Sequence, residues 1–150
     1  MKAVESDGIT ILPFSMDNYT QAWELWDRSL PHSHDNSWNY AMTGRFLRHN
    51  PELCFSAFKG EQLIGTVMGS FDGRRGYIQH LAVDQSCRRS GTGRALMKKV
   101  TDAMREMDIR KVHLMVKNDN ITVQEFYEKL SWDAREDITI MSIRLKEEEL

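Results

Sequence analysis

The stretch LAVDQSCRRSGTGRAL, residues 81–96, decides the fold, because it joins the end of a strand, a basic loop and the start of a helix. Gly91 and Gly93 lack a Cβ where the backbone has to turn and a ligand has to approach closely. The free N–H groups and the positive dipole end of a helix's first turn bind phosphate oxygens. Arg88, Arg89 and Arg94 add positive charge. The stretch therefore predicts a pyrophosphate site.

Two other phosphate-binding loops do not fit this stretch. Leu96 stands where the dinucleotide motif G-x-G-x-x-G needs its third glycine, and no Gly-Lys-Ser/Thr follows as in a Walker A loop. The strand before the loop also follows an antiparallel meander instead of opening a Rossmann unit. A plain tight turn before the helix stays open as the structural alternative.

Strand patterns lie mainly upstream of this loop. Residues 9–12 predict a first strand, and residues 54–58, 63–70 and 77–83 predict a three-stranded meander. Lys59-Gly60-Glu61-Gln62 supplies the first of its turns and Asp72-Gly73 the second. Downstream of the loop, alternation over residues 112–116 and 138–145 predicts two more strands, of which the last closes the sheet.

Helical spacing of apolar residues marks four further segments. Residues 16–30, a stretch from 38 or 39 to 48, and residues 92–107 each predict an amphipathic helix. Thr122 and Glu125 form a capping box that opens a short fourth helix. The order β-α-α-β-β-β-α-β-α-β predicts the α+β class, with helices on both faces of a mixed sheet. The absence of repeats and linkers indicates a single domain over residues 1–150.

The composition narrows the classes of partner and site that this chain is expected to have. The 20 basic residues against 22 acidic ones argue against a nucleic-acid partner, which needs a large positive excess on one face. Cys54 and Cys87 show no zinc spacing, so no metal site is expected and reduced thiols fit a cytoplasmic protein. Residues 1–8 lack the apolar core of a signal peptide, and no apolar run approaches a membrane span, so no membrane partner is expected.

Two spaced motifs carry a family resemblance. Arg88-x-x-Gly91-x-Gly93 after Leu81-Ala82-Val83 resembles the Q/R-x-x-G-x-G/A signature of GNAT acetyltransferases. Downstream, NITVQEFYEKLSW (residues 120–132) is similar to the family's N-x-x-A-x-x-F/L-Y-E-K-L-G-F. The resemblance spans residues 54–145, and GTVMGSFDGRRG (residues 65–76) further resembles the small YpeA-type subgroup.

The resemblance implies an N-acetyltransferase that passes an acetyl group from acetyl-CoA to a primary amine of a small molecule or peptide in a ternary complex. It also implies that strand 81–83 pairs with the pantetheine arm, that the loop wraps the pyrophosphate and that the neighbouring strand splays away to leave a slot for the thioester. The implied cofactor-binding residues are Leu81, Ala82, Val83, Arg88, Arg89, Ser90, Gly91, Thr92, Gly93, Arg94, Asn120 and Tyr127. A homodimer is common in this family.

The chemistry requires a deprotonated amine, stabilisation of an oxyanion and a proton for the thiolate. A backbone N–H at the 81–83 strand end can face the carbonyl oxygen. Tyr127 can give its phenolic proton to the sulfur, because phenol and thiol pKa values, about 10 and 8.5, are close. Tyr127 as an ordinary core tyrosine is the alternative.

The general base is the gap in this chemistry. Related enzymes place a carboxylate or histidine at positions equivalent to Tyr77 or Gln79, or a glutamate at the position equivalent to Met115, and this sequence has none of these. Simple alternation puts His80 on the side of its strand opposite Tyr77 and Gln79, so a packed or surface histidine is favoured over a base. A water chain can take the proton instead, and loop residues His32, His34 and Asp35 are further options beside a solvated surface.

The acceptor side is the least defined part of the sequence. Trp38, Tyr77 and Gln79 are the tentative substrate residues, while Trp23 and Trp26 have the spacing of core positions. Ser131 and Trp132 replace the family's glycine and Phe or Tyr, and Ser131 is expected at a left-handed cap. The missing base leaves a second reading open, an acyl-CoA-binding or regulatory module without turnover.

Overall fold

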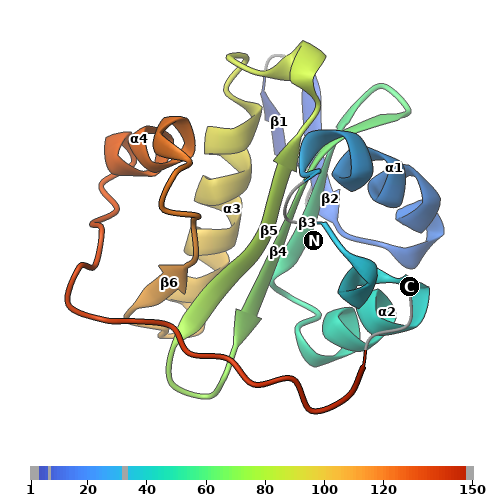
Figure 1. Cartoon of the computed structure of the whole chain (residues 1–150). Helices are drawn as coiled ribbons and strands as arrows, with labels where there is room; N and C mark the ends of the chain where they lie inside the picture. The colour runs from blue at the N-terminus through green and yellow to red at the C-terminus, as the bar shows by residue number, and fades with distance from the viewer. Residues whose placement is uncertain (1–3, 7, 32–33, 148–150) are drawn as a thin grey trace. The chain divides into compact units, whose positions relative to one another are not determined.

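The computed structural model describes residues 4–6, 8–31 and 34–147, with the backbone alone for residues 4–6. The chain divides into two compact units, Met1–Leu114 and Met115–Leu150. The first unit contains the sheet and the helices that cover it, as Figure 1 shows.

The first unit is built on one six-stranded sheet in the order β1-β2-β3-β4-β5-β6. Neighbouring strands run antiparallel except β5 and β6, which are parallel, so the sheet is mixed as predicted. The strands are β1 (Val4–Ser6), β2 (Ile9–Pro13), β3 (Cys54–Lys59), β4 (Gln62–Phe71), β5 (Gly76–Val83) and β6 (Val112–Leu114). The predicted meander is therefore confirmed, and β1 is an edge strand that the sequence pattern did not reveal.

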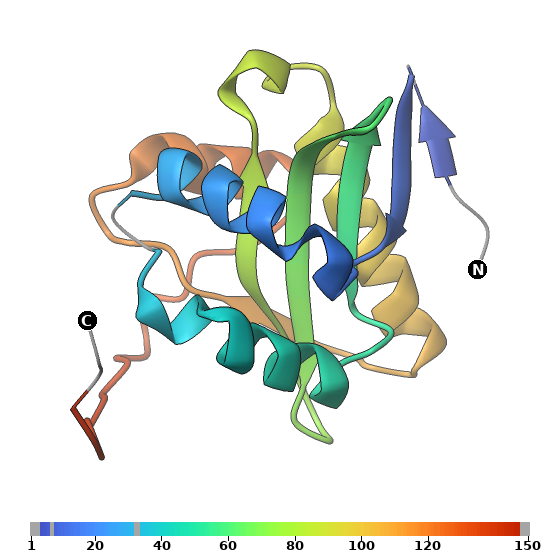
Figure 2. The ribbon, with the colours of Figure 1, turned by 90° about the vertical axis from the view of Figure 1, so that its right-hand side faces the viewer.

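Three α-helices cover the sheet of this unit, as Figure 2 shows. Helices α1 (Tyr19–Ser29) and α2 (Tyr40–His49) lie on one face, and α3 (Thr92–Glu106) lies on the other. Short 3-10 turns are η1 (Met16–Asn18), η2 (Asn36–Trp38) and η3 (Gln85–Cys87). The Asn39 side chain accepts the Met42 N–H at 2.9 Å, which fixes where α2 begins. Helices on both faces were predicted, and this is confirmed.

Trp26 is the centre of the core under α1. It is fully buried, it stacks on Phe14, and it packs with Met68 and Ala82 from the sheet. Its indole Nε1–H donates to the Thr66 hydroxyl at 2.8 Å, so the polar atom of the indole is satisfied inside the core. Trp26 is thus a core residue, as its helical spacing indicated.

Glycines on β4 and β5 let α3 lie close to the opposite face. A Cβ on Gly69 would lie 2.7 Å from the Leu53 carbonyl oxygen and 2.8 Å from Val100 of α3. A Cβ on Gly76 would lie 2.9 Å from the Met104 sulfur. Both positions therefore face α3, and any side chain there would push the helix off the sheet.

A β-bulge in β5 overturns the predicted alternation along that strand. Met68 pairs with His80 but Gly69 pairs with Ile78, which leaves Gln79 as an extra residue. Opposite residues in antiparallel strands share a face, so Ile78 follows Gly69 toward α3 while His80 follows Met68 toward α1. His80 therefore lies on the same face as Tyr77, and the expectation that it faces the other way is wrong.

The second unit contains one helix, α4 (Ile121–Lys129). The Asn120 side chain accepts the Val123 N–H at 3.3 Å, so Asn120 caps α4 and Thr122 lies within its first turn. The predicted capping box at Thr122 is therefore wrong. Residues 138–145 form no strand, and their apolar side chains, such as Ile140 and Ile143, are exposed. The predicted closing strand is thus also wrong.

Within the described residues, no helix is long and apolar enough to cross a membrane. Cys54 and Cys87 are free thiols. The same part of the chain holds no group of three metal-ligating side chains.

Candidate active site

The loop between β5 and α3 has the geometry of an anion site. Gly91 takes a left-handed φ of 86° and stands at the N-cap of α3 without a side-chain cap. The first helical backbone bond is donated by Ala95 to Gly91 at 2.9 Å, so the N–H groups of Thr92, Gly93 and Arg94 have no intrahelical acceptor. These three donors and the helix dipole present positive potential at one point.

Basic side chains surround these donors. Arg88, Arg89 and Arg94 are exposed, and no ion pair ties them to any described residue. The Ser90 hydroxyl donates to the Cys87 carbonyl and lies 2.8 Å from the Thr92 hydroxyl, which folds the loop back on the start of α3. The loop can therefore hold an anion with more than one negative oxygen, as predicted.

Asp84 fixes the beginning of the loop. Its carboxylate receives the Arg28 guanidinium of α1 at 2.6 Å and the Ser86 N–H at 3.0 Å. The hydrogen bond from Arg28 is the largest cause that holds the pKa of Asp84 below its usual range, followed by the bonds from Ser86. A charged Asp84 therefore ties the loop between β5 and α3 to α1.

One edge of β5 is open next to this loop. The parallel pairing of β5 with β6 ends at Ile78 and Leu114, and the stretch from Leu81 through Ala82 to Val83 lies beyond it. In the described chain, no backbone hydrogen bond joins this stretch to β6. A free strand edge can pair with an extended polar chain as an added strand does. The structure thus places the predicted strand and loop residues side by side.

The bulge at Gln79 opens toward a cavity of about 480 Å³ between the sheet and α2. Trp38 and Gln79, two of the three tentative substrate residues, both line it. Tyr77 does not line it, and its hydroxyl lies 3.4 Å from a carboxylate oxygen of Asp72. Arg45 and His49 also line the cavity and were missed, because only the packing of α2 on the sheet shows which helix face meets the strand.

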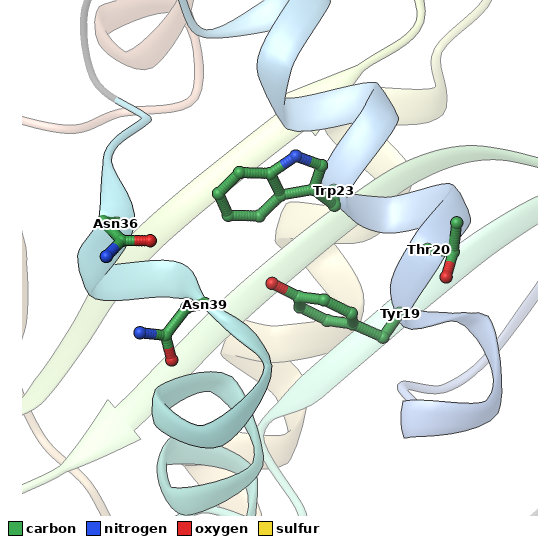
Figure 3. A pocket seen from close by; sticks show the side chains of 5 residues that line it. All are labelled: Tyr19, Thr20, Trp23, Asn36 and Asn39. Carbon is green, nitrogen blue, oxygen red and sulfur yellow. The ribbon is translucent and has the colours of Figure 1, made fainter. Parts of the chain in front are cut away.

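A second cavity of about 320 Å³ lies between α1 and the start of α2. Figure 3 shows Trp23 and Tyr19 of α1 opposite Asn36 and Asn39. The Tyr19 hydroxyl donates to the Trp38 carbonyl at 2.7 Å, and this bond ties the loop to α1. Trp23 therefore lines this cavity in addition to packing as a helix residue.

His80 is buried in an aromatic cluster under this loop. It is 3% exposed, and its ring centroid lies 4.6 Å from that of Trp38 and 4.8 Å from that of Trp26. Burial lowers the pKa of His80 to about 3 and also lowers the pKa of His34, whose ring lies 5.8 Å away. His80 is therefore a packed neutral imidazole, not an exposed base. His32, another predicted option, lies outside the described residues.

The second unit holds the predicted proton donor. Tyr127 is 9% exposed and packs edge-on against Phe126 and Trp132. Burial raises the pKa of Tyr127 to about 12, so the phenol keeps its proton at neutral pH. Its hydroxyl makes no hydrogen bond with the part of the chain that the structure describes. Asn120 is used as the cap of α4, although its amide N–H groups stay available.

Comparisons with known proteins agree on one family. The sequence model of the Acetyltransferase (GNAT) family matches residues 19–132. An acetyltransferase of Pectobacterium atrosepticum is 32% identical over 129 residues, which cover 85% of this chain and 89% of that protein. Human N-alpha-acetyltransferase 30 is 41% identical over 96 residues, which cover 60% of this chain and 26% of that protein.

The solved structures agree. The crystal structure of Ard1 from Thermoplasma volcanium has a TM-score of 0.75 to this chain at 27% identity, and the match covers 82% of this chain and 81% of that one. The likeness to the YpeA-type subgroup and the single-domain boundary stay predictions. The chain belongs to the GNAT acetyltransferase family, and it is an acyltransferase that uses acetyl-CoA as its cosubstrate to acetylate amines.

Proposed function

We propose that this chain transfers the acetyl group of acetyl-CoA directly to a primary amine of a small molecule or peptide while both substrates are bound. The observation that carries the proposal is the uncapped start of α3 at left-handed Gly91, directly after the open edge of β5. The helix start and Arg88 hold the pyrophosphate, and the backbone of Leu81 and Val83 holds the pantetheine arm.

The bulge and the Gln79 cavity then supply the acceptor side. The amine nitrogen attacks the thioester carbonyl carbon, a C–N bond forms, and the carbonyl oxygen becomes an oxyanion next to a backbone N–H of β5. When the C–S bond breaks, the sulfur leaves with the electron pair and takes a proton from the Tyr127 hydroxyl, and the tyrosinate regains a proton from water. The proton of the amine passes to water, because His80 is buried and neutral.

A peptide α-amine is supported as one acceptor class by the likeness to human N-alpha-acetyltransferase 30. Family membership favours turnover over the regulatory reading, because the named relatives are acetyltransferases. A cytoplasmic location and a homodimer are carried forward as part of this proposal.

The first experiment measures thiol release from acetyl-CoA with a panel of amines and peptides. Tyr127→Phe is compared with Tyr40→Phe, a matched change at an exposed tyrosine of α2. We expect acceptor-dependent release that falls at least about tenfold in Tyr127→Phe and stays within twofold in Tyr40→Phe, as loss of a general acid predicts. Equal rates in the two variants would remove Tyr127 from the chemistry.

The loop is tested separately with a shortened donor. Arg88→Glu should raise the KM for acetyl-CoA about tenfold or more, because it replaces a phosphate-facing charge by its opposite. S-acetylpantetheine lacks the pyrophosphate, so its KM should be the same in Arg88→Glu and in the unmodified protein. A loss of the same size with both donors would show that the variant disturbs the fold instead of a phosphate contact.

A further inference from the structure

We infer that the acceptor carries a carboxylate a few bonds from its reacting amine, and that the Arg45 guanidinium on α2 binds this carboxylate. The inference rests on the proposed function, since it places the acceptor in the cavity beside Gln79. It names a substrate class that the two motifs of the cofactor site leave undefined.

The charge of the cavity wall is the first argument. Arg45 and His49 are the titratable side chains that line the cavity, and no aspartate or glutamate of the described chain lines it. The two residues are four positions apart in one helix, so they project from the same face. A wall of this kind repels polycationic amines and attracts an anionic group.

The second argument is that Arg45 is not already paired. Its guanidinium forms no ion pair with any described residue, whereas Arg28 is bound to Asp84 and Arg105 to Asp102. Its planar fork of N–H donors matches the two oxygens of a carboxylate. Arg45 is therefore free to take a ligand.

His49 is oriented toward the same task. Its Nδ1 lies 3.0 Å from the Arg45 carbonyl oxygen, so Nδ1 carries the proton that this carbonyl accepts. This bond turns Nε2 away from the helix backbone. The neighbouring Asn50 is already used, because its amide donates to the Phe46 carbonyl and accepts the Phe71 N–H. Nε2 can donate to a carboxylate only when the His49 ring carries both protons, so Arg45 is the group of α2 in the cavity that donates to a carboxylate in every case.

The rest of the cavity fits such a molecule. Trp38 and Phe46 give it an apolar wall on which the carbon chain between amine and carboxylate can lie. Both a peptide with an acidic residue at its N-terminus and a small amino-dicarboxylate meet this description.

The test uses acceptors matched in size and opposite in charge. Thiol release from acetyl-CoA is measured with short peptides that differ only in glutamate or lysine at the first residue, and with free glutamate and lysine amide as small-molecule arms. We expect kcat/KM to be about tenfold higher for the glutamyl peptide at low ionic strength and the difference to shrink with added salt. Preference confined to free glutamate would identify a small molecule as the source of the carboxylate.

Arg45→Glu should reverse the order of the two peptides. Arg48→Glu is the matched control, because Arg48 lies on the same helix but does not line the cavity. Arg48→Glu should leave the ratio of kcat/KM between the glutamate and lysine peptides within twofold of its value in the unmodified protein. Equal or better use of the lysine acceptors by the unmodified protein, or an unchanged ratio in Arg45→Glu, would overturn the inference.

Failure of the proposed function gives a different result. If no amine raises thiol release, the same acceptors are titrated by calorimetry into the CoA-loaded protein. Tighter binding of the glutamate acceptors without turnover would support the carboxylate site and contradict the proposed acetyl transfer. Equal binding of both charges, or no binding of either, would contradict the carboxylate site.

Discussion

The imidazole of His80 lies flat on the indole of Trp38, with ring centroids 4.6 Å apart and ring planes 7° from parallel. His80 belongs to β5, next to the bulge, and Trp38 belongs to the loop before α2. This stack therefore connects β5 to a wall of the cavity beside Gln79. The bulge at Gln79 makes the contact, because it turns His80 toward the α1 and α2 face.

The titration of His80 should lower the free energy of unfolding in mild acid. Its pKa is about 3 when folded, because burial opposes the charge, and about 6.5 when unfolded. As the pH falls, the unfolded chain therefore binds a proton at His80 before the folded chain does. The contribution of neutral His80 to the free energy of unfolding is complete above pH 6.5 and is lost as the pH falls toward 3. The groups around His80 are Trp26, Trp38, His34 and Asp35.

This contribution amounts to about 1.4 kcal/mol per pH unit inside that window. His80→Phe keeps an aromatic ring and removes the titration. Urea unfolding at pH 7.0 and pH 5.0 should show a smaller loss in the variant, by about 2 kcal/mol. The same pH dependence in both proteins would show that folding does not lower the pKa of His80.

Thr66→Val should destabilise the core under α1 through a single hydrogen bond. The substitution keeps the shape of the side chain but leaves the buried Nε1–H of Trp26 without its acceptor. We expect a loss of about 1–3 kcal/mol in the free energy of unfolding. Thr66→Ser is the control, since it keeps the hydroxyl. If Thr66→Val is as stable as the unmodified protein, the hydrogen bond does not stabilise the core.

Asp84→Ala should weaken the binding of acetyl-CoA indirectly, through the order of the loop that follows Asp84. The variant removes the ion pair with Arg28 and the cap on the Ser86 N–H, so the loop that follows is less ordered. We expect the KM for acetyl-CoA to rise about two- to fivefold, as the loss of about 1 kcal/mol implies, with kcat unchanged. Asp102→Ala removes a comparable carboxylate from the exposed side of α3 and should leave the KM unchanged. A fall in kcat alone would contradict this role.

Ser131→Gly should stabilise the second unit. Ser131 follows α4 with a φ of 73°, as the family's glycine at this position led us to expect. A residue with a Cβ is strained there by roughly 1 kcal/mol, and glycine removes the strain. Amide hydrogen exchange in α4 should slow in the variant by up to about fivefold, since glycine also loosens the unfolded chain. Faster exchange would show that the Ser131 side chain makes a contact worth more than the strain.

The sequence predicted the meander, α3 and the loop between β5 and α3, because each follows from a pattern of neighbouring residues. Alternation over residues 54–58 and 63–70 and the turn at Gly60 lie within a few residues of one another. The loop needs only a strand end, Gly91 and a helix start in succession. The strand, loop and helix start that carry the predicted cofactor residues were therefore predictable before any long-range contact was known.

The tertiary structure decided what depends on partners distant in the chain. The bulge at Gln79 appears only when β5 is paired with β4, and it changes the face on which His80 lies. Arg45 and His49 become cavity residues only because α2 packs beside that bulge. Residues 138–145 show the converse, since their strand-like alternation finds no partner strand in the structure. A local sequence pattern determines which side chains share a face of a helix or strand. Packing against other elements determines which of these faces lines a cavity, and neighbouring residues in the sequence do not encode that packing.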